Sequence, residues 1–169
     1  GENELRAVWK KEISKKNPGI EEDKISMPVV VPGLTNGIAQ IADLFVEEGD
    51  NIVVPDMFWG NYRLIFEQRK QAVIKGFPFF TSEGGLNVSG FETAMKGAAV
   101  NKKIILVVNF PNNPTGYSPT KKEAEELKNM ITGLAEEGYK ILAIMDDAYF
   151  GLFYENDLAY RGEALVNWS

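Results

Sequence analysis

The sequence predicts an α/β fold with a largely parallel sheet. Short apolar runs that suit buried strands alternate along the chain with apolar residues at helical spacing, which is the pattern of βαβ units. The clearest strand signal is the run of aliphatic residues at 104–108, because parallel strands are covered by helices on both faces. With 169 residues, the chain suits a single domain that buries roughly two-thirds of the surface exposed by its unfolded form. We therefore expect one sizeable core.

Strands are predicted in the first half of the chain at 27–31, 51–55 and 72–77. Each is a short apolar run ended by a turn signal, such as Pro32-Gly33 after the first. An amphipathic helix with a basic outer face is expected over 2–16, and shorter helices are expected between the strands. The apolar positions that predict these helices are Leu5, Val8, Trp9 and Ile13 in the first, Ile38, Ile41, Ala42 and Phe45 in the second, and Ile65 and Phe66 in the third.

The second half of the chain is predicted to contain strands at 103–109 and 141–145, each preceded by a helix. Ser89 with Glu92, and Thr120 with Glu123, have the spacing of a capping box at a helix start. The first of these helices is expected to end at Gly97 and the second at Gly138. The apolar stripe of the second is Ala124, Leu127, Ile131 and Leu134.

Composition excludes several classes of function. The 24 acidic and 18 basic residues give a net charge of −6, which does not favour binding to nucleic acid or to anionic lipid. The chain contains no cysteine and no histidine, so disulfides, thiolate chemistry and Ser-His-Asp catalysis are excluded. It has neither an apolar run of membrane-spanning length nor a signal-peptide core. We expect a soluble, cytoplasmic protein that acts on small molecules, and a chain that is part of a longer protein.

One edge of the predicted sheet collects the candidate binding residues. Right-handed crossovers place the segments that follow the strands along the same edge, near Gly33, Trp59, Asn113 and Asp146. Ligands of open α/β sheets bind at the carboxyl ends of the strands. This edge is therefore the candidate site.

Each segment at this edge also has a simpler interpretation. The loop NFPNNPTG at 109–116 offers the amides of Asn112 and Asn113 on a proline-stiffened backbone, or it is only a turn. Gly33 with the amides of Leu34 and Thr35 suits a phosphate at a helix start, or it only caps the helix. The two remaining segments carry Trp59, which suits stacking on a planar ring or packing in a core, and Asp146 with Asp147, which suit a cationic ring nitrogen or a surface pair.

Taken in this order, the segments resemble the class I/II aminotransferases of fold type I, which depend on pyridoxal phosphate. The resemblance covers nearly the whole chain. It is carried by PGLTNG at 32–37, the aromatic loop that begins at Asp56, NNPTG at 112–116 and DDAY at 146–149. It implies a three-layer α/β/α sandwich with a mostly parallel sheet, in which residues 1–169 form an incomplete cofactor-binding large domain.

The resemblance also implies a role for each matching residue. Leu34 and Thr35, after Gly33, would bind the cofactor phosphate, although Leu34 offers only its amide where many relatives have a hydroxyl residue. Trp59 would stack on the pyridine ring. Asn113 and Tyr149 would bind the phenolic oxygen of the ring. Asp146 would pair with the protonated ring nitrogen.

The lysine that the family uses to form a Schiff base with the cofactor has no match in this sequence. It normally follows the D-x-A-Y strand in an S-x-S-K context, and no lysine stands between Tyr149 and Ser169. Lys75, Lys103 and Lys140 fall on other parts of the fold. The arginine that binds the substrate carboxylate belongs to a small domain that also has no match. We therefore expect this segment to be inactive alone, with no catalytic residue of its own.

The parent protein is expected to be a homodimeric aminotransferase that passes an amino group from an amino acid to a 2-oxo acid. Two alternatives stay open at this point. One is a non-catalytic effector-binding domain of a transcription regulator, since some regulators carry a fused aminotransferase-like domain. The other is a lyase or synthase that uses pyridoxal phosphate on the same fold.

Overall fold

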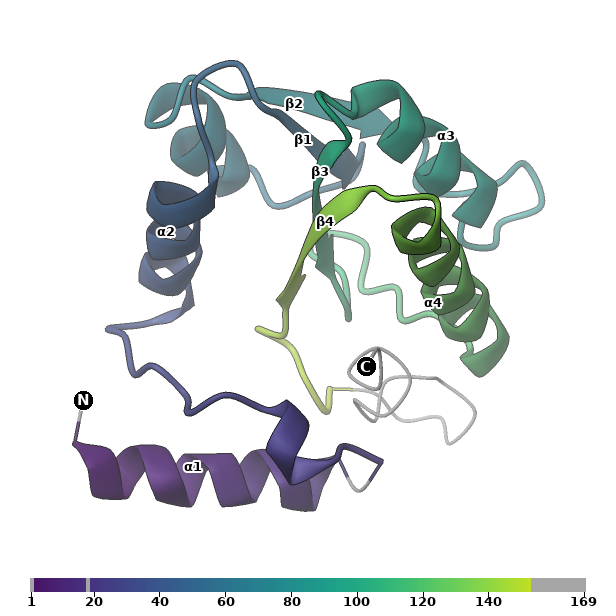
Figure 1. Cartoon of the computed structure of the whole chain (residues 1–169). Coiled ribbons are helices and arrows are strands. Elements are labelled where there is room, and N and C mark those ends of the chain that lie inside the picture. The colour runs from purple at the N-terminus through teal and green to yellow at the C-terminus, as the bar shows by residue number, and fades with distance from the viewer. Residues whose placement is uncertain (1, 18, 153–169) are drawn as a thin grey trace.

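A computed structural model describes residues 2–17 and 19–152. Four strands form one sheet, and every pair of neighbouring strands is parallel. The strands are β1 (Asn51–Pro55), β2 (Val73–Phe77), β3 (Lys103–Asn109) and β4 (Lys140–Asp146), arranged in the order β2-β1-β3-β4 (Figure 1). The predicted parallel sheet is confirmed, and β3 lies inside it, between β1 and β4.

Helices cover both faces of this sheet. Helices α3 (Val88–Ala98) and α4 (Lys121–Glu136) lie on one face, while α2 (Leu34–Phe45) and the π-helical segment η2 (Arg63–Gln68) lie on the other (Figure 1). Successive side chains of a strand point to opposite faces. Ile104, Leu106 and Val108 of β3 therefore pack against α3 and α4, while Ile105 and Val107 pack against α2 and η2. The fold is the expected three-layer α/β/α sandwich.

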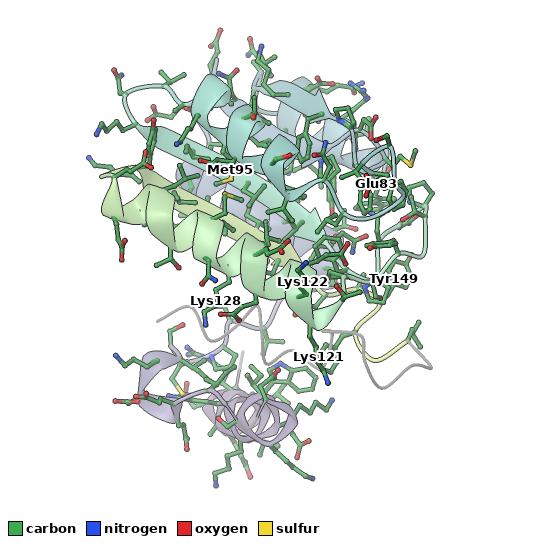
Figure 2. All side chains as sticks on the ribbon, turned by 90° about the vertical axis from the view of Figure 1, so that its right-hand side faces the viewer. Glu83, Met95, Lys121, Lys122, Lys128 and Tyr149 are labelled. Carbon is green, nitrogen blue, oxygen red and sulfur yellow. The ribbon has the colours of Figure 1, made fainter. Side chains whose placement is uncertain are left out.

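Helix α4 agrees with the sequence pattern in detail. Both halves of its capping box form, because Thr120 accepts from the amide of Glu123 and the Glu123 carboxylate accepts from the amide of Thr120. Its buried residues are the predicted stripe of Ala124, Leu127, Ile131 and Leu134. Figure 2 views the molecule from the side of α3 and α4, with the buried Met95 on α3 and the exposed Lys121 and Lys122 on α4.

The strand predicted at 27–31 is wrong, because the structure has no strand over these residues. The segment is largely exposed, and 74% of the surface of Val29 is open to solvent. An apolar, β-branched run becomes a strand only when a neighbouring strand satisfies its backbone. Among the described residues no strand lies beside it, since the sheet ends at β2 and β4.

Three smaller predictions also need correction. Asn87, not Ser89, caps α3 by accepting from the amide of Gly90, and the helix runs past Gly97 to Ala98. In α2, Phe45 is 51% exposed, whereas Ala39 joins the core with Ile38 and Ala42. Helix α1 (Asn3–Lys16) forms as predicted but buries none of its residues, so its apolar stripe remains uncovered in the described structure.

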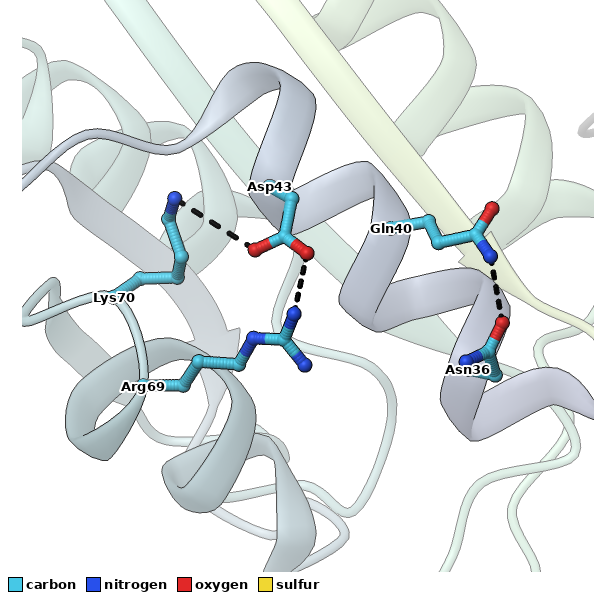
Figure 3. Close-up of polar contacts among 5 residues, drawn as sticks. All are labelled: Asn36, Gln40, Asp43, Arg69 and Lys70. Atoms are coloured by element: carbon cyan, nitrogen blue, oxygen red, sulfur yellow. Dashed lines mark hydrogen bonds and ion pairs between the residues drawn. The ribbon is translucent and has the colours of Figure 1, made fainter.

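Helix α2 is tied to the end of η2 on its outer side. Asp43 forms ion pairs with Arg69 and Lys70, and one turn away Gln40 donates to Asn36 within α2 (Figure 3). Arg69 and Asp43 are solvent-exposed and Lys70 is half-buried, so these ion pairs contribute little to stability. Within the described residues, no helix has both the length and the apolar character that crossing a membrane requires.

Candidate functional site

A pocket of about 220 Å³ lies where β3 and β4 end and α2 begins. Its walls come from four segments that are far apart in the sequence. The lining residues are Leu34, Thr35, Trp59, Asn109, Asn113, Asp146, Ala148 and Tyr149. All the predicted binding residues except Gly33 are therefore in one place.

A second, larger hollow of about 400 Å³ lies beside α1 and is lined by Leu5, Trp9, Val29, Val30, Val31, Gly33 and Leu34. This lining offers no titratable side chain. A specific site needs a few placed polar groups among its apolar walls. We therefore place the candidate site at the smaller pocket.

Asn109 connects the ends of β3 and β4. It pairs in register with Asp146 across the two strands, and its side-chain amide donates to the backbone carbonyl of Asp146 at 2.8 Å. Its side-chain oxygen accepts from the backbone amide of Asn113 at 2.7 Å. Asn109 therefore fixes the start of the 109–116 loop to the strand that carries Asp146.

The two asparagines of this loop have different tasks. Asn112 is buried; its side-chain oxygen accepts from the amide and hydroxyl of Thr115, and its side-chain nitrogen donates to the carbonyl of Met57 at 3.2 Å. It holds the loop in shape and against the segment after β1, which agrees with the structural one of the two interpretations that the sequence left open for this amide. Asn113 lines the pocket instead, and its side-chain nitrogen donates to the hydroxyl of Tyr149 at 3.2 Å.

Asp146 presents a buried carboxyl group to the pocket, with only 6% of the residue exposed. Its Oδ2 accepts from the hydroxyl of Tyr62 at 2.6 Å, and its Oδ1 accepts from the amide of Ala148 at 3.2 Å. Within residues 2–17 and 19–152 it makes no ion pair with a lysine or an arginine. A buried charge with no cationic partner is costly unless hydrogen bonds or a ligand compensate it.

Asp147 is different, since the residue is exposed and lies outside the pocket lining. Partial burial of its carboxyl group, followed by the charge of Asp146, raises its pKa to about 6. The first of the two aspartates is thus the one that faces the pocket.

Tyr62 is a residue behind the pocket that the sequence did not indicate, and Asn109, which lines it, is another. Tyr62 is 1% exposed, and its burial, together with the hydrogen bond and charge of Asp146, raises the pKa of its hydroxyl far above the usual range. The available signal was its position one helical turn after Trp59, since a buried tyrosine requires a partner for its hydroxyl. That partner is 84 residues away, so sequence spacing did not indicate it.

Trp59 is half-buried and forms part of the pocket wall. Its ring meets the ring of Tyr62 edge-on, with centroids 5.6 Å apart and planes at 88°. Such edge-to-face pairs are a preferred aromatic geometry.

The start of α2 completes the pocket with Leu34 and Thr35. Gly33 precedes them as the N-cap residue with φ 94°, and no side chain caps the helix. The first amides of a helix have no partner within the helix, so the amides at this end are available to an anion. Gly33 itself is not among the lining residues, and it does not follow a strand, which corrects the expectation that a strand leads into this helix. Glycine suits the position because of its positive φ, since a Cβ atom there would meet nothing within 4 Å.

No lysine lines the pocket among the described residues, and every lysine of the sequence stands at or before Lys140. Lys103 lies at the start of β3, the end opposite the pocket, where it pairs with Asp50 at 2.6 Å. Lys140 likewise begins β4.

Comparison with known protein families identifies the family of this chain. The family model for aminotransferase class I and II matches residues 2–167. The chain belongs to the class I and II aminotransferases.

Individual aminotransferases are similar to this chain at modest identity. The aspartate aminotransferase of Bacillus sp. (strain YM-2) is 30% identical over 129 residues, which cover 75% of this chain and 30% of the relative. That of Bacillus subtilis (strain 168) is 28% identical over 136 residues, covering 79% and 32%. The chain thus spans about a third of the length of these curated relatives.

Solved aminotransferase structures share the fold. An aminotransferase from Anaerococcus prevotii superposes with a TM-score of 0.70 at 29% identity, covering 80% of this chain and 33% of that one. The aspartate aminotransferase of Rhizobium meliloti gives a TM-score of 0.77 at 18% identity, covering 97% and 39%. At 18% identity, the second comparison shows a shared fold and nothing more.

The pocket of this aminotransferase chain has the donor set that pyridoxal phosphate requires. The buried carboxylate of Asp146 has no cationic partner in the described structure and suits a protonated ring nitrogen. Trp59 offers an aromatic wall, and Asn113 and Tyr149 offer donors for an oxygen atom. The uncapped start of α2 suits a phosphate group. The residues therefore fit the cofactor.

Proposed function

We propose that this chain is the major part of the cofactor-binding large domain of an amino-acid aminotransferase, which transfers an amino group from an amino acid to a 2-oxo acid through pyridoxal phosphate. The observation that carries the proposal is the pocket in which the buried Asp146, the Asn113–Tyr149 pair, Trp59 and the start of α2 meet. Membership of the family supports it.

In this proposal each wall of the pocket binds one part of the cofactor. The carboxylate of Asp146 pairs with the ring nitrogen and keeps it protonated. Trp59 holds the plane of the ring, and Asn113 and Tyr149 donate to the phenolic oxygen. The amides of Leu34 and Thr35, with the Thr35 hydroxyl, bind the phosphate, and Gly33 gives the backbone the conformation that begins the helix.

Pyridoxal phosphate, when bound, supplies an electron-withdrawing ring that stabilises negative charge at the α-carbon of the substrate. The protein determines how strongly the ring withdraws electrons. A carboxylate beside the ring nitrogen favours the protonated, cationic ring. The hydrogen bonds around Asn109 hold that carboxylate and the 109–116 loop in a fixed relation, so the polar groups need little reorganisation on binding.

We further propose that the covalent lysine and the arginine for the substrate carboxylate come from parts of the parent protein outside residues 1–169. The 169-residue chain alone then binds the cofactor weakly, without a covalent bond, and has no turnover. The parent protein is a cytoplasmic homodimer in this proposal, which rests on the usual organisation of the family.

The test is amino transfer by the complete protein. Purified protein is loaded with pyridoxal phosphate, and glutamate formation from 2-oxoglutarate is measured with a panel of amino donors. We expect glutamate with at least one donor, and a loss of at least a hundredfold in the Asp146→Ala variant, since the ring then loses its cationic form. The matched control is Asp147→Asn, whose side chain lies outside the pocket.

Cofactor binding without glutamate from any donor would contradict amino transfer and would favour a lyase, a synthase or an effector-binding domain. Equal activity of Asp146→Ala and the unaltered protein would contradict the role of Asp146.

A further inference from the structure

Tyr62 contacts both Asp146 and Trp59 from behind the pocket. It is not part of the lining, and it is among the largest fully buried side chains of the chain. It lies just before η2, on the segment that begins with the aromatic loop after β1. Its hydroxyl reaches Oδ2 of Asp146 at 2.6 Å, and its ring meets Trp59 edge-on.

The hydrogen bond has a defined direction when Asp146 is ionised. A carboxylate can only accept, so the tyrosine hydroxyl donates. Burial, together with the hydrogen bond and the charge of Asp146, raises the pKa of this hydroxyl far above its usual range, so the hydroxyl keeps its proton at neutral pH. Oδ1 receives the amide of Ala148 in the same way. Each carboxylate oxygen thus has one protein donor, and its remaining lone pairs are available toward the pocket.

A donor to the ionised form of a carboxylate makes it a weaker base. If a carboxylate and a ring nitrogen share a proton, the weaker the carboxylate is as a base, the more the proton stays on the nitrogen. The hydroxyl of Tyr62 therefore acts on the charge of a ring that it does not touch.

We propose that Tyr62 is a positioning residue of the cofactor site, which orients the Asp146 carboxylate and keeps the shared proton on the ring nitrogen while its own ring supports Trp59. This inference rests on the proposed function, because it concerns pyridoxal phosphate in the same pocket. It adds a residue that acts through Asp146 and Trp59, without contact with the cofactor.

The Tyr62→Phe variant separates the two contacts. Phenylalanine keeps the aromatic ring that packs against Trp59 and removes only the hydroxyl. The loss of a hydrogen bond to a charged group corresponds to a factor of roughly ten to a hundred in the proton equilibrium between carboxylate and ring nitrogen. The proton then shifts toward Asp146, and the ring becomes less cationic.

The readout is the nitrogen-15 chemical shift of the ring in ¹⁵N-labelled pyridoxal phosphate bound to the complete protein. We expect the pyridinium value in the unaltered protein and a displacement toward the neutral pyridine value in Tyr62→Phe. Asp146→Asn calibrates the neutral end, because an amide cannot pair with a ring cation. In the double variant Tyr62→Phe with Asp146→Asn, the tyrosine change should add no further displacement.

Tyr117→Phe is the matched control. Tyr117 also donates its hydroxyl to a carboxylate, that of Glu123 at 2.7 Å, but it does not line the pocket. We expect this variant to lose stability and to leave the ring nitrogen at the value of the unaltered protein.

A second change keeps the inference testable if Tyr62→Phe does not fold. Incorporation of 3-fluorotyrosine at position 62 retains the hydroxyl and makes it a stronger donor, so the ring nitrogen should stay at, or move further toward, the pyridinium value. Displacement toward the neutral value in this protein would overturn the inference.

The outcomes for this inference and for the proposed function are distinct. Failure of the unaltered protein to bind pyridoxal phosphate would refute the proposed function. Binding with the same nitrogen-15 shift in the unaltered protein and in Tyr62→Phe would refute the role of Tyr62 alone.

Discussion

Replacing Glu123 by glutamine should destabilise the domain more than any other exposed-face change on α4. The Glu123 carboxylate accepts four hydrogen bonds: Oε1 from the amide of Leu86 and the hydroxyl of Tyr117, both at 2.7 Å, and Oε2 from the amide and hydroxyl of Thr120 at 2.7 and 2.9 Å. One side chain therefore joins the start of α4 to the end of the 109–116 loop and to the segment before α3.

The expected decrease in the free energy of unfolding follows from these contacts. Glutamine keeps one oxygen, so whichever way its amide is turned, the NH₂ group faces one backbone amide, to which it offers no acceptor, and one hydroxyl, which must turn to accept from it. One hydrogen bond is lost, one is reversed, and the other two change from charged to neutral. Hydrogen bonds to charged groups contribute about 1.5–3 kcal/mol each when buried; since this site is half-exposed, we expect a total loss of about 3 kcal/mol. For a domain of this size, that lowers the melting temperature by roughly 10 °C.

The assay is urea unfolding of the 169-residue chain, with Glu126→Gln as the matched control. Glu126 lies on the same helix and has only a weak contact with Lys122 at 3.7 Å, so its replacement should change the free energy of unfolding by about 0.5 kcal/mol or less. Equal midpoints for Glu123→Gln and Glu126→Gln would refute the reasoning.

The stability that the Glu123 carboxylate contributes has a defined pH dependence. Partial burial raises the pKa of Glu123, but the amides of Thr120 and Leu86 and the hydroxyls of Tyr117 and Thr120 outweigh it, so the pKa is lowered. A lowered pKa adds stability above the ordinary value of 4.5, and this contribution is lost as the pH falls through the folded-state value. The difference between the unaltered chain and Glu123→Gln should therefore shrink in acid. A constant difference from pH 7 to pH 3 would contradict this.

Three further predictions concern the core, Asp147 and the lysines. Leu127→Ala should cost about 3 kcal/mol in urea unfolding, because Leu127 is fully buried, whereas Lys128→Ala should cost less than about 1 kcal/mol; similar losses would contradict the packing. The pKa of Asp147 is raised to about 6 from 3.8, so the folded state binds the proton more tightly and stability should fall as the pH rises from about 4 to about 6; Asp147→Asn should remove that slope, and an unchanged slope would exclude Asp147 as its source. Borohydride treatment of the 169-residue chain with pyridoxal phosphate should leave no covalent adduct by mass spectrometry, and an adduct on one specific lysine would contradict the proposed location of the covalent lysine.

The elements that the sequence predicts correctly are those with local signals. The β3 strand is a continuous aliphatic run covered on both faces, and α4 has a capping box and an apolar stripe within its own residues. The run at 27–31 has a similar composition, but a strand depends on the neighbour that pairs with it, and none is present in the described sheet. The Asn87 cap of α3 shows the same limit on a smaller scale, because two nearby polar residues could cap the helix and backbone geometry selects one.

The candidate site shows the same difference between what the sequence predicts and what packing decides. Motif order indicated Trp59, Asn113, Asp146 and Tyr149, because strand ends of a parallel sheet meet at one edge whatever lies between them. Leu34 and Thr35 reach the same pocket from the start of α2 without a preceding strand. The residues by themselves left open which carboxylate or amide of a pair turns inward, and only the resemblance to the family selected Asp146 and Asn113. The structure turns Asp146 into the pocket and leaves Asp147 outside, and it directs Asn113 to Tyr149 while Asn112 holds the loop.

Residue types and their spacing thus specify the parallel sheet, the family and the edge at which the binding groups gather, since these depend on periodicity and on chain order. The contacts behind the pocket depend on packing between distant segments. Tyr62 meets Asp146 across 84 residues, and Glu123 meets Leu86 across 37. Such pairs form only when the sheet brings β1, β3 and β4 together, because a buried donor and a buried acceptor must satisfy each other once water is excluded.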